Sequence, residues 1–205
     1  MPVVDRVIRP ASPGDERPAA AVFARAFAED PLYRWIFPDE AARARRLPRL
    51  FATQLRATVR GHGEIDLMVA GEQILGCAVW SPPGASRPTA GQQIAVLAAF
   101  PLILGRRLPV ALGSFNAVGR TRPKEPHWYL STIGVDPSAQ RTGVAKGLLQ
   151  PRLARCDQDQ VPVGLVTGEQ SNVRYYESFG FAVTSQVELP GGGPVHWTMW
   201  RTSRQ

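Results

Sequence analysis

The chain has 205 residues, of which 44% are hydrophobic and 20% are charged. A chain of this length and composition buries a core without disulfides or structural metals, which excludes disordered, collagen-like and disulfide-scaffold proteins. The formal net charge is +7, and all but Lys124 and Lys146 of the 24 basic residues are arginines. Such a charge is typical either of codon bias or of a surface that binds anions.

The cysteines and the ends of the chain give further exclusions. Cys77 and Cys156 have no second Cys or His at ligand spacing, so we expect neither a zinc site nor any other metal. The N-terminus lacks the apolar stretch of a secretory signal, and the longest apolar run, residues 94–104, is too short to span a bilayer. We therefore expect a cytoplasmic protein without a membrane partner.

Hydrophobic periodicity and turn residues predict the elements in chain order. Strands are predicted at residues 6–10, 65–70, 74–80, 127–135, 162–167, 181–189 and 195–200. Helices are predicted from residue 15 to about 29, then at 39–60, in two or three pieces within 89–120, and at 143–157 and 172–179. Strands and helices in this order, without a repeat or a linker, predict a single mixed α/β domain.

The loop after the strand at 127–135 carries the clearest chemical signal. The strand ends at Asp136-Pro137, and Gln140, Arg141 and Gly143 precede a helix. The first amides of such a helix have no carbonyl partners and lie at the positive end of its dipole, so they attract an anion. Gly143 permits a positive φ angle or the close approach of a ligand. The pattern indicates an anion site, to which Arg141 and Lys146 add positive charge.

This loop resembles the acetyl-CoA signature of the GCN5-related N-acetyltransferases (GNAT), Gln/Arg-x-x-Gly-x-Gly/Ala, which stands here as Gln140-Arg141-Thr142-Gly143-Val144-Ala145. Residues 172–181 resemble the family's second motif, Asn…Tyr-Glu-x-x-Gly-Phe. Within the family, residues 122–130 and the Trp197-x-Met199 ending are most similar to puromycin N-acetyltransferases. The likeness is dense only from about residue 122. We divide the single domain, residues 1–205, into an acceptor-side half (1–121) and an acetyl-CoA-binding half (122–205).

The resemblance implies an α/β fold with a central mixed, mostly antiparallel sheet, splayed at the cofactor cleft and flanked by helices. It places the pantetheine arm of acetyl-CoA along the backbone of Ile133, Gly134 and Val135, and the diphosphate on the amides of residues 141–146. Asn172 either holds the pantetheine amide or simply caps its helix. The implied cofactor-binding residues are Ile133, Gly134, Val135, Gln140, Arg141, Thr142, Gly143, Val144, Ala145, Lys146 and Asn172.

The resemblance also implies a reaction in which the amine attacks the thioester directly, without a covalent enzyme intermediate. A backbone N–H near Ile133 would polarise the thioester carbonyl. Tyr176 matches the family tyrosine that acts as general acid toward the leaving thiolate; the alternative is that it is a core aromatic.

The general base stays open at this stage. Puromycin N-acetyltransferases have a glutamate in a Leu-Glu-Thr triplet, where this chain has Leu165-Val166-Thr167. His127 is one candidate, although a lone histidine is often structural. Glu29 and Asp30, between the first two helices, are candidates for the base or for binding the amine, and the alternative is that they are only solvated at a helix end.

Four aromatic residues, Phe27, Tyr33, Trp35 and Tyr129, are candidates for lining the acceptor site or for packing in the core. We expect the acceptor to be a small-molecule primary amine, such as that of an aminonucleoside antibiotic. The alternatives are a protein or peptide N-acetyltransferase and a non-catalytic acyl-CoA-binding module. No nucleic-acid-binding motif is present, so we expect no nucleic-acid partner, and a homodimer is left open.

The basic charge lies away from the phosphate loop. Residues 73–124 contain no Asp or Glu. Their basic residues are Arg87, Arg106, Arg107, Arg120, Arg122 and Lys124. This segment is either a product of composition bias or a part of the acceptor side or of a partner surface.

Overall fold

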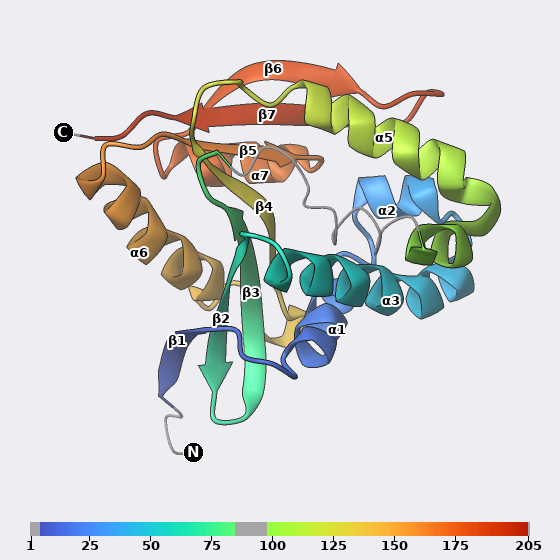
Figure 1. The fold of residues 1–205 in the computed structure, drawn as a ribbon, viewed down its shortest axis with the longest axis horizontal. Helices are drawn as coiled ribbons and strands as arrows, with labels where there is room; N and C mark the ends of the chain where they lie inside the picture. The colour runs from blue at the N-terminus through green and yellow to red at the C-terminus, as the bar shows by residue number, and fades with distance from the viewer. Residues whose placement is uncertain (1–4, 85–97, 205) are drawn as a thin grey trace.

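The computed structural model describes residues 5–84 and 98–204, which form a seven-stranded sheet in the order β1-β2-β3-β4-β5-β7-β6 (Figure 1). The strands are β1 (Arg6–Pro10), β2 (Glu64–Ala70), β3 (Gln73–Ser81), β4 (Trp128–Val135), β5 (Val163–Thr167), β6 (Ala182–Glu188) and β7 (Val195–Arg201). The β4–β5 pair is parallel and the other neighbouring strands are antiparallel. The predicted mixed, mostly antiparallel sheet is therefore confirmed.

The helices are α1 (Glu16–Ala26), α2 (Pro31–Ile36), α3 (Glu40–Val59), α5 (Leu108–Arg120), α6 (Val144–Gln158) and α7 (Gln170–Glu177). Residues 98–104 are also helical and continue through a short 3-10 turn, Gly105–Arg107, into α5. The helical pieces predicted within 89–120 are thus confirmed from residue 98 onward, and residues 89–97 lie outside the described residues. None of the described helices is both long and apolar enough to cross a membrane.

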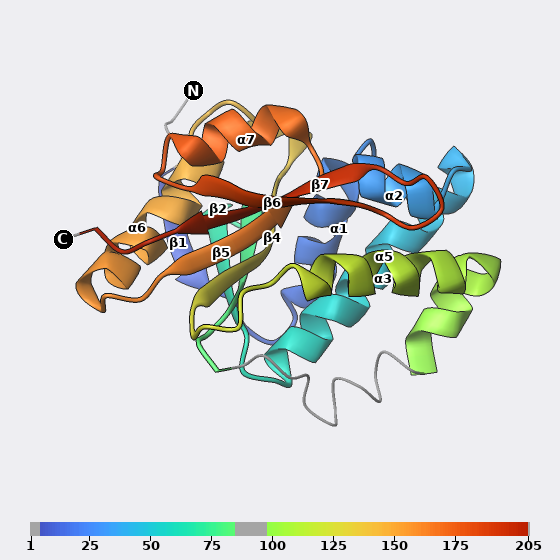
Figure 2. The same cartoon turned by 90° about the horizontal axis from the view of Figure 1, so that it is seen from above.

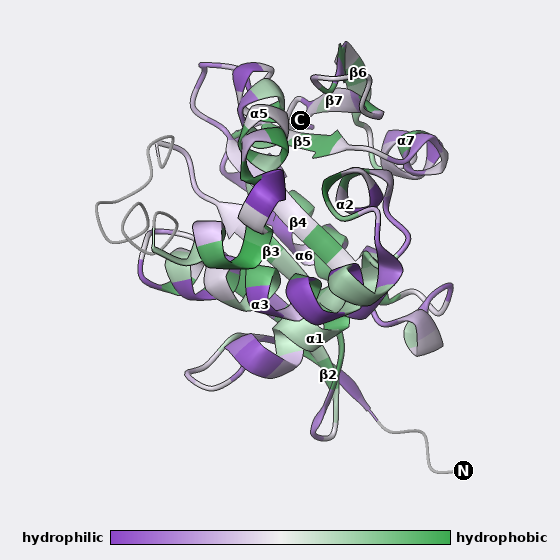
Figure 3. Cartoon of the chain, turned by 90° about the vertical axis from the view of Figure 1, so that its right-hand side faces the viewer, coloured by the Kyte–Doolittle hydropathy of each residue, from purple (hydrophilic) through white to green (hydrophobic). Residues whose placement is uncertain are grey.

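Each face of the sheet has its own core. One cluster joins the sheet to α1, α2 and α3 and includes Leu67 and Cys77, whereas the other joins it to α6 and α7 and includes Met68 and Ala78. Adjacent residues enter opposite cores because strand side chains alternate between faces. Figure 2 shows α6 and α7 on one side of the molecule and α1, α3 and α5 on the other. The central strand β3 is hydrophobic along most of its length and is buried on both faces (Figure 3).

The sheet opens between β4 and β5. Val79 on β3 pairs with Thr132 and the next residue, Trp80, pairs with Leu130, so Ser131 is the extra residue of a β-bulge on β4. Beyond the bulge β4 no longer pairs with β5, because the parallel register covers only Trp128–Leu130. The splay that the resemblance implied is therefore present, and it begins at the bulge.

Two details differ from the sequence-based expectation. Helix α2 was not predicted, since six residues between prolines carry little periodicity; it forms because the Asp30 side chain accepts hydrogen bonds from the amides of Leu32 and Tyr33, at 2.9 and 3.4 Å. Helix α7 begins at Gln170 with Glu169 as its N-cap residue, so the interpretation of Asn172 as the cap is wrong.

Candidate active site

Asp136 fixes the point at which β4 leaves the sheet and the loop begins. Its carboxylate accepts hydrogen bonds from the Ser138 hydroxyl at 2.6 Å and from the Arg25 guanidinium of α1 at 2.5 and 2.8 Å. Burial alone would raise the pKa of Asp136, but the bonds from Ser138 and Arg25 outweigh it and hold this pKa below its usual range. The carboxylate stays ionised and ties the loop to α1.

The loop backbone has an unusual conformation at Arg141 and Gly143, whose φ angles are 61° and 88°. A Cβ added to Gly143 would meet no atom within 4 Å, so the glycine is required by the backbone angle and not by crowding. The Arg6 side chain, from β1, donates to the carbonyl and the hydroxyl of Thr142 at 2.8 and 3.0 Å. These bonds hold the loop in place from outside.

The loop presents free backbone donors. The first turn of α6 closes with the bond from the Gly147 amide to the Gly143 carbonyl at 2.9 Å, and the amides of residues 141–146 donate to no residue in the described part of the chain. Arg141, Thr142 and Gly143 are exposed. These amides stand at the positive end of a 15-residue helix, which is the arrangement that binds phosphate groups. The predicted anion site thus has the backbone geometry that such a site needs.

The cofactor candidates on β4 lie along its splayed part. Gly134 is buried against α1, since an added Cβ would stand 2.7 Å from Phe23 and 3.2 Å from Ala26. Ile133 and Val135 are partly buried and pack on the α6 side of the sheet. The register of β4 with β5 ends at Leu130, so β5 does not cover the edge of β4 that carries residues 133–135.

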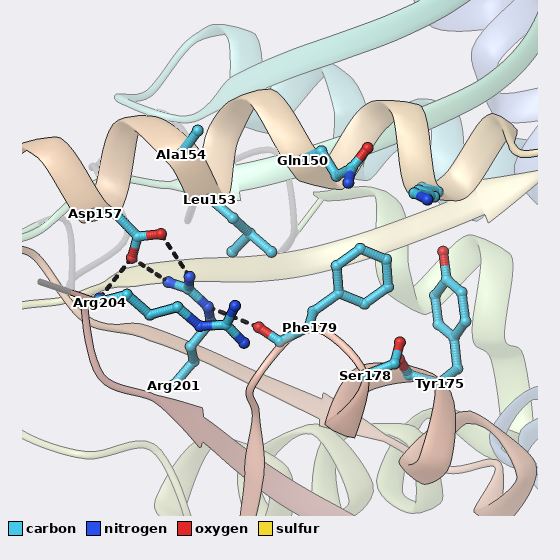
Figure 4. Close-up of a pocket in the computed structure, with 10 residues that line it drawn as sticks. Gln150, Leu153, Ala154, Asp157, Tyr175, Ser178, Phe179, Arg201 and Arg204 are labelled. Atoms are coloured by element: carbon cyan, nitrogen blue, oxygen red, sulfur yellow. Dashed lines mark hydrogen bonds and ion pairs between the residues drawn. The ribbon is translucent and has the colours of Figure 1, made fainter.

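Beyond this loop, a groove of about 560 Å³ lies between α6 and α7 (Figure 4). Its lining includes Lys146 and Gln150 from α6 and Tyr175 from α7. The Tyr175 hydroxyl points toward α6 in this view. The ring of Tyr175 also packs against Tyr176, so this side chain borders both the core and the groove.

An ion pair closes the far end of this groove. Arg201 donates to both carboxylate oxygens of Asp157, at 2.7 and 2.6 Å, and to the carbonyl of Phe179 at 2.8 Å. Arg204 also lines this end of the groove. The charge of Arg201 is therefore matched by Asp157, whereas Arg204 and Lys146 bring positive charge to the two ends of the groove.

Tyr176 lies beside the groove but inside the α6-side core, where 7% of its surface is exposed. Its ring makes edge contacts with Tyr175 and Phe181, with centroids 5.6 and 5.9 Å apart. Burial raises the pKa of Tyr176, so the phenol keeps its proton and can act only as a donor or neutral acceptor near neutral pH. The two sequence-based alternatives, core aromatic and proton donor, are compatible in this geometry.

The candidate bases lie in different places. The Nδ1 atom of His127 lies 2.6 Å from the Glu125 carbonyl, and the ring packs on Trp200 with centroids 4.9 Å apart. His127 stands at the start of β4, whereas the loop follows its last residue, Val135, roughly 25 Å of extended chain away. Glu29 is exposed and pairs with Arg43 and Arg34, at 3.2 and 3.4 Å. The structure therefore places His127 at the end of β4 far from the loop and engages Glu29 in ion pairs.

Asp30 differs from its neighbour because it is largely buried. Burial raises the pKa of Asp30 to about 6, against the lowering effect of the amides of Tyr33 and Leu32, and the charge of Glu169 raises it further. Glu169 comes directly before α7, after the end of β5. The turn between α1 and α2 thus places one carboxylate near another at the open end of β5.

The aromatic acceptor candidates are engaged in packing. Phe27 and Tyr33 belong to the α1-side core and share ring contacts with Phe51 at 5.5 and 5.2 Å. Trp35 packs on the glycine-rich turn between β6 and β7, where a Cβ at position 193 would stand 2.9 Å from its indole nitrogen. Tyr129 is buried beneath the Arg122 guanidinium, 3.5 Å from the ring centroid. Each ring has a structural role, whether or not it also borders the acceptor.

Other sequence candidates are exposed. Gln140 donates to the Val135 carbonyl at 3.4 Å and thereby braces the loop. Asn172 is exposed in the first turn of α7. One polar side chain, His196 on β7, was missed: it is 4% exposed and lies beside Gly168 at the end of β5. No local motif surrounds it, and only its place on an alternating strand could have marked it as buried.

Comparison with known proteins agrees with this geometry. Residues 105–201 match the family model described as Acetyltransferase (GNAT) domain. A structure described as histone acetyltransferase HPA2 and related acetyltransferase from Corynebacterium glutamicum is 26% identical, with a TM-score of 0.75, and the match covers 98% of this chain and 97% of that one. The described residues thus form a single mixed α/β fold like that of GNAT acetyltransferases, residues 105–201 match the model of that domain, and these likenesses support an acyltransferase enzyme.

More distant relatives share the fold or a short stretch of sequence. A ribosomal-protein alanine N-acetyltransferase from Escherichia coli is 14% identical, with a TM-score of 0.58 and coverage of 98% and 96% of the two chains. An uncharacterized N-acetyltransferase of Schizosaccharomyces pombe is 34% identical over 62 residues, which is 30% of this chain. The match spans only 25% of that relative's length.

Proposed function

We propose that this protein transfers an acetyl group from acetyl-CoA to a primary amine of a small molecule, by direct attack of the amine within a ternary complex. The observation that carries the proposal is the group of free amides at residues 141–146, at the end of the strand that separates from β5. A phosphate-binding helix terminus next to an opened sheet suits a ligand with a diphosphate and a long, narrow arm.

The residues present fit acetyl-CoA as the acyl donor. The amides of residues 141–146 would hold the diphosphate, and Gly143 allows the positive φ angle of the loop that presents them. Lys146 and Tyr175 line the groove that continues from the loop, where the nucleotide end of the molecule would lie. The pantetheine arm would follow the edge of β4 at residues 133–135. Acetyl-CoA supplies the activated thioester.

The chain itself would supply positioning, a dipole and a proton. A backbone N–H of β4 near Ile133 would donate to the thioester carbonyl and stabilise the charge that develops on its oxygen. Tyr176 stays protonated because burial raises its pKa, and it would donate a proton to the sulfur as the carbon–sulfur bond breaks. Holding both reactants in place accounts for much of the rate in such a mechanism.

The acceptor site is proposed at the open end of β5, where Asp30 and Glu169 lie near each other. Two carboxylates favour a cationic acceptor such as an alkylammonium group. The likeness of residues 122–130 to puromycin N-acetyltransferases puts aminonucleosides first among the small amines to be tested. A protein or peptide acceptor is the second candidate, because relatives of this fold are described as histone and ribosomal-protein acetyltransferases.

A thiol-release assay with acetyl-CoA tests this proposal. The acceptors are aminonucleosides, arylamines, polyamines and peptides with free N-termini or lysines, and mass spectrometry identifies the acetylated product. We expect release of CoA with at least one small amine and slower release with peptides. Faster release with peptides would favour the second candidate, and binding of acetyl-CoA without release by any acceptor would contradict the proposal.

A further inference from the structure

The sequence does not identify the general base, because Val166 stands where puromycin N-acetyltransferases have a glutamate. We propose that His196 takes the proton from the acceptor amine, with Asp30 and Glu169 attracting the ammonium form of that amine. This inference rests on the proposed function. The ammonium form first passes one proton to Nε2 of His196, directly or through one water, which leaves a neutral amine. As the nitrogen–carbon bond forms and the carbon–sulfur bond breaks, Tyr176 gives its proton to the thiolate. The second proton that leaves the nitrogen then restores the proton of Tyr176 through water.

The strand register places His196 on the face of the sheet where the acceptor is expected. On β7, Met199 belongs to the α6-side core, so alternation puts His196 and Thr198 on the opposite face. This face is shared by Val166 of β5, which pairs with Thr198. His196 thus lies one strand away from Val166 and toward the open end of β5.

A close contact holds the tip of the imidazole at the end of β5. A Cβ at position 168 would stand 2.6 Å from Nε2 of His196, so only glycine lets the ring reach this position. Residue 168 directly precedes Glu169, whose charge acts on Asp30. The His196 ring therefore lies at the connection between β5 and α7, and Trp35 of α2 packs on the turn that precedes β7.

The tautomer of His196 follows from the hydrogen-bond partner of its Nδ1 atom. Nδ1 lies 3.3 Å from the carbonyl of Pro194, and a carbonyl oxygen can only accept, so Nδ1 carries the hydrogen. Burial lowers the pKa of His196, which keeps the ring neutral near pH 7. Nε2 then has a lone pair and no hydrogen, which is the state that a proton acceptor needs.

The proposed acceptor end has two carboxylates and an unsatisfied hydroxyl. Asp30 is the N-cap residue of α2 and Glu169 comes directly before α7, whereas the nearby basic residues Arg34 of α2 and Arg174 of α7 are exposed. Glu188 of β6 pairs with Val195 and therefore lies on the opposite face of the sheet from His196. The hydroxyl of Thr198, 1% exposed and two residues from His196 on the same face, has no hydrogen-bond partner among the described residues. A bound amine with several N–H donors would satisfy it.

The test compares two variants of His196 with a variant of the exposed His62. His196→Asn keeps a side-chain N–H near the position of Nδ1, so it can still donate to Pro194, but it removes Nε2. His196→Gln places an amide near Nε2 that cannot take a proton. His62→Asn is the control, and thermal unfolding of every variant shows whether it is folded.

We expect both His196 variants to lower kcat by about 100-fold at pH 7, as for the loss of a general base. The dissociation constant for acetyl-CoA should change less than about 3-fold, because His196 does not contact the donor in this proposal. The defect should shrink at high pH, where the acceptor amine is already neutral. His62→Asn should match the wild-type protein.

A folded His196 variant with wild-type kcat and an unchanged pH profile would overturn the role of His196 while leaving acetyl transfer intact. A folded variant whose kcat falls equally at every pH would also overturn it, because a merely structural histidine would behave in that way. If the wild-type protein releases no CoA with any acceptor, the proposed function fails first, and the role of His196 fails with it.

Discussion

At the scale of single residues, Asp30 is a largely buried carboxylate whose ionised form is disfavoured by its surroundings. Its pKa is raised to about 6, mainly by burial, although it also caps α2. An acid whose pKa is higher in the folded state destabilises the fold once the pH exceeds its unfolded value, near 4. A residue that costs stability in this way is typical of a functional site.

Asp30→Asn should therefore stabilise the protein at pH 8 by up to about 3 kcal/mol, since each pKa unit corresponds to about 1.4 kcal/mol. Asparagine caps a helix as well as aspartate does, so α2 should remain. The gain should disappear below about pH 4, where Asp30 is protonated in both states. Urea unfolding at pH 4 and pH 8 measures both values, and a variant that is less stable than the wild type at pH 8 would show that the buried charge carries no penalty.

Tyr176 makes the second prediction at this scale. Tyr176→Phe keeps the ring contacts with Tyr175 and Phe181 but removes the hydroxyl. We expect kcat to fall by about 10- to 100-fold, as for the loss of an acid catalyst, with little change in stability or in the affinity for acetyl-CoA. Steady-state kinetics and calorimetric titration separate these effects. An unchanged kcat would leave Tyr176 as a core aromatic only.

At the scale of elements, the loop between β4 and α6 joins strand, turn and helix into one binding feature. Its shape depends on the positive φ of Gly143 and on external bonds from Arg6 to Thr142. Gly71, in the turn between β2 and β3, offers a matched control: its φ is also positive, at 58°, and an added Cβ would likewise meet nothing within 4 Å.

Gly143→Ala and Gly71→Ala should each cost about 1 kcal/mol of stability, because an L residue is strained at positive φ. Only Gly143→Ala should also weaken acetyl-CoA binding, by about tenfold, since strain at this position would shift the amides that we propose bind the phosphate. Urea unfolding and calorimetric titration of both variants measure these quantities. Equal affinities in the two variants would show that the phosphate does not lie on this loop.

The sequence predicts most elements because their signals are local. The short apolar runs of β2 and β3 and the turn glycines are readable within ten residues, and the loop at Gln140 to Ala145 combines backbone chemistry with a family signature. Helix α2 was not predicted, because it has only six residues and its formation depends on one N-cap residue, Asp30. The start of α7 was predicted two residues late, at 172 instead of Gln170, since helix ends are set by backbone contacts and not by residue type alone.

The acceptor end could not be predicted for a different reason. Asp30, Glu169 and His196 are far apart in the chain, and no short motif joins them. The sheet order places β7 between β5 and β6 and so brings His196 to the β5–α7 connection, and Trp35 of α2 packs on the turn that precedes β7. His127, the histidine that the sequence favoured, lies at the opposite end of the same sheet face, against Trp200.

At the scale of the whole molecule, the arginines prove to have separate roles. Within the acid-free segment, Arg107 donates to the carbonyls of Trp35 and Ile36 at 2.5 and 3.0 Å, and Arg122 covers Tyr129. Arg106, Arg120 and Lys124 are exposed, and Arg87 lies outside the described residues. Part of the basic charge thus holds α5 and β4 against their neighbours, and the anion site that we propose consists of backbone amides instead.

The binding of acetyl-CoA is the claim on which the rest depends, and isothermal titration of the wild-type protein with acetyl-CoA tests it most directly. We expect one site per chain with a dissociation constant of about 1–100 µM, in the range of ordinary enzyme substrates. Such binding should also raise the melting temperature as the ligand concentration increases. The absence of binding heat at concentrations of about 1 mM, with no change in melting temperature, would contradict both the cofactor site and the acetyltransferase function.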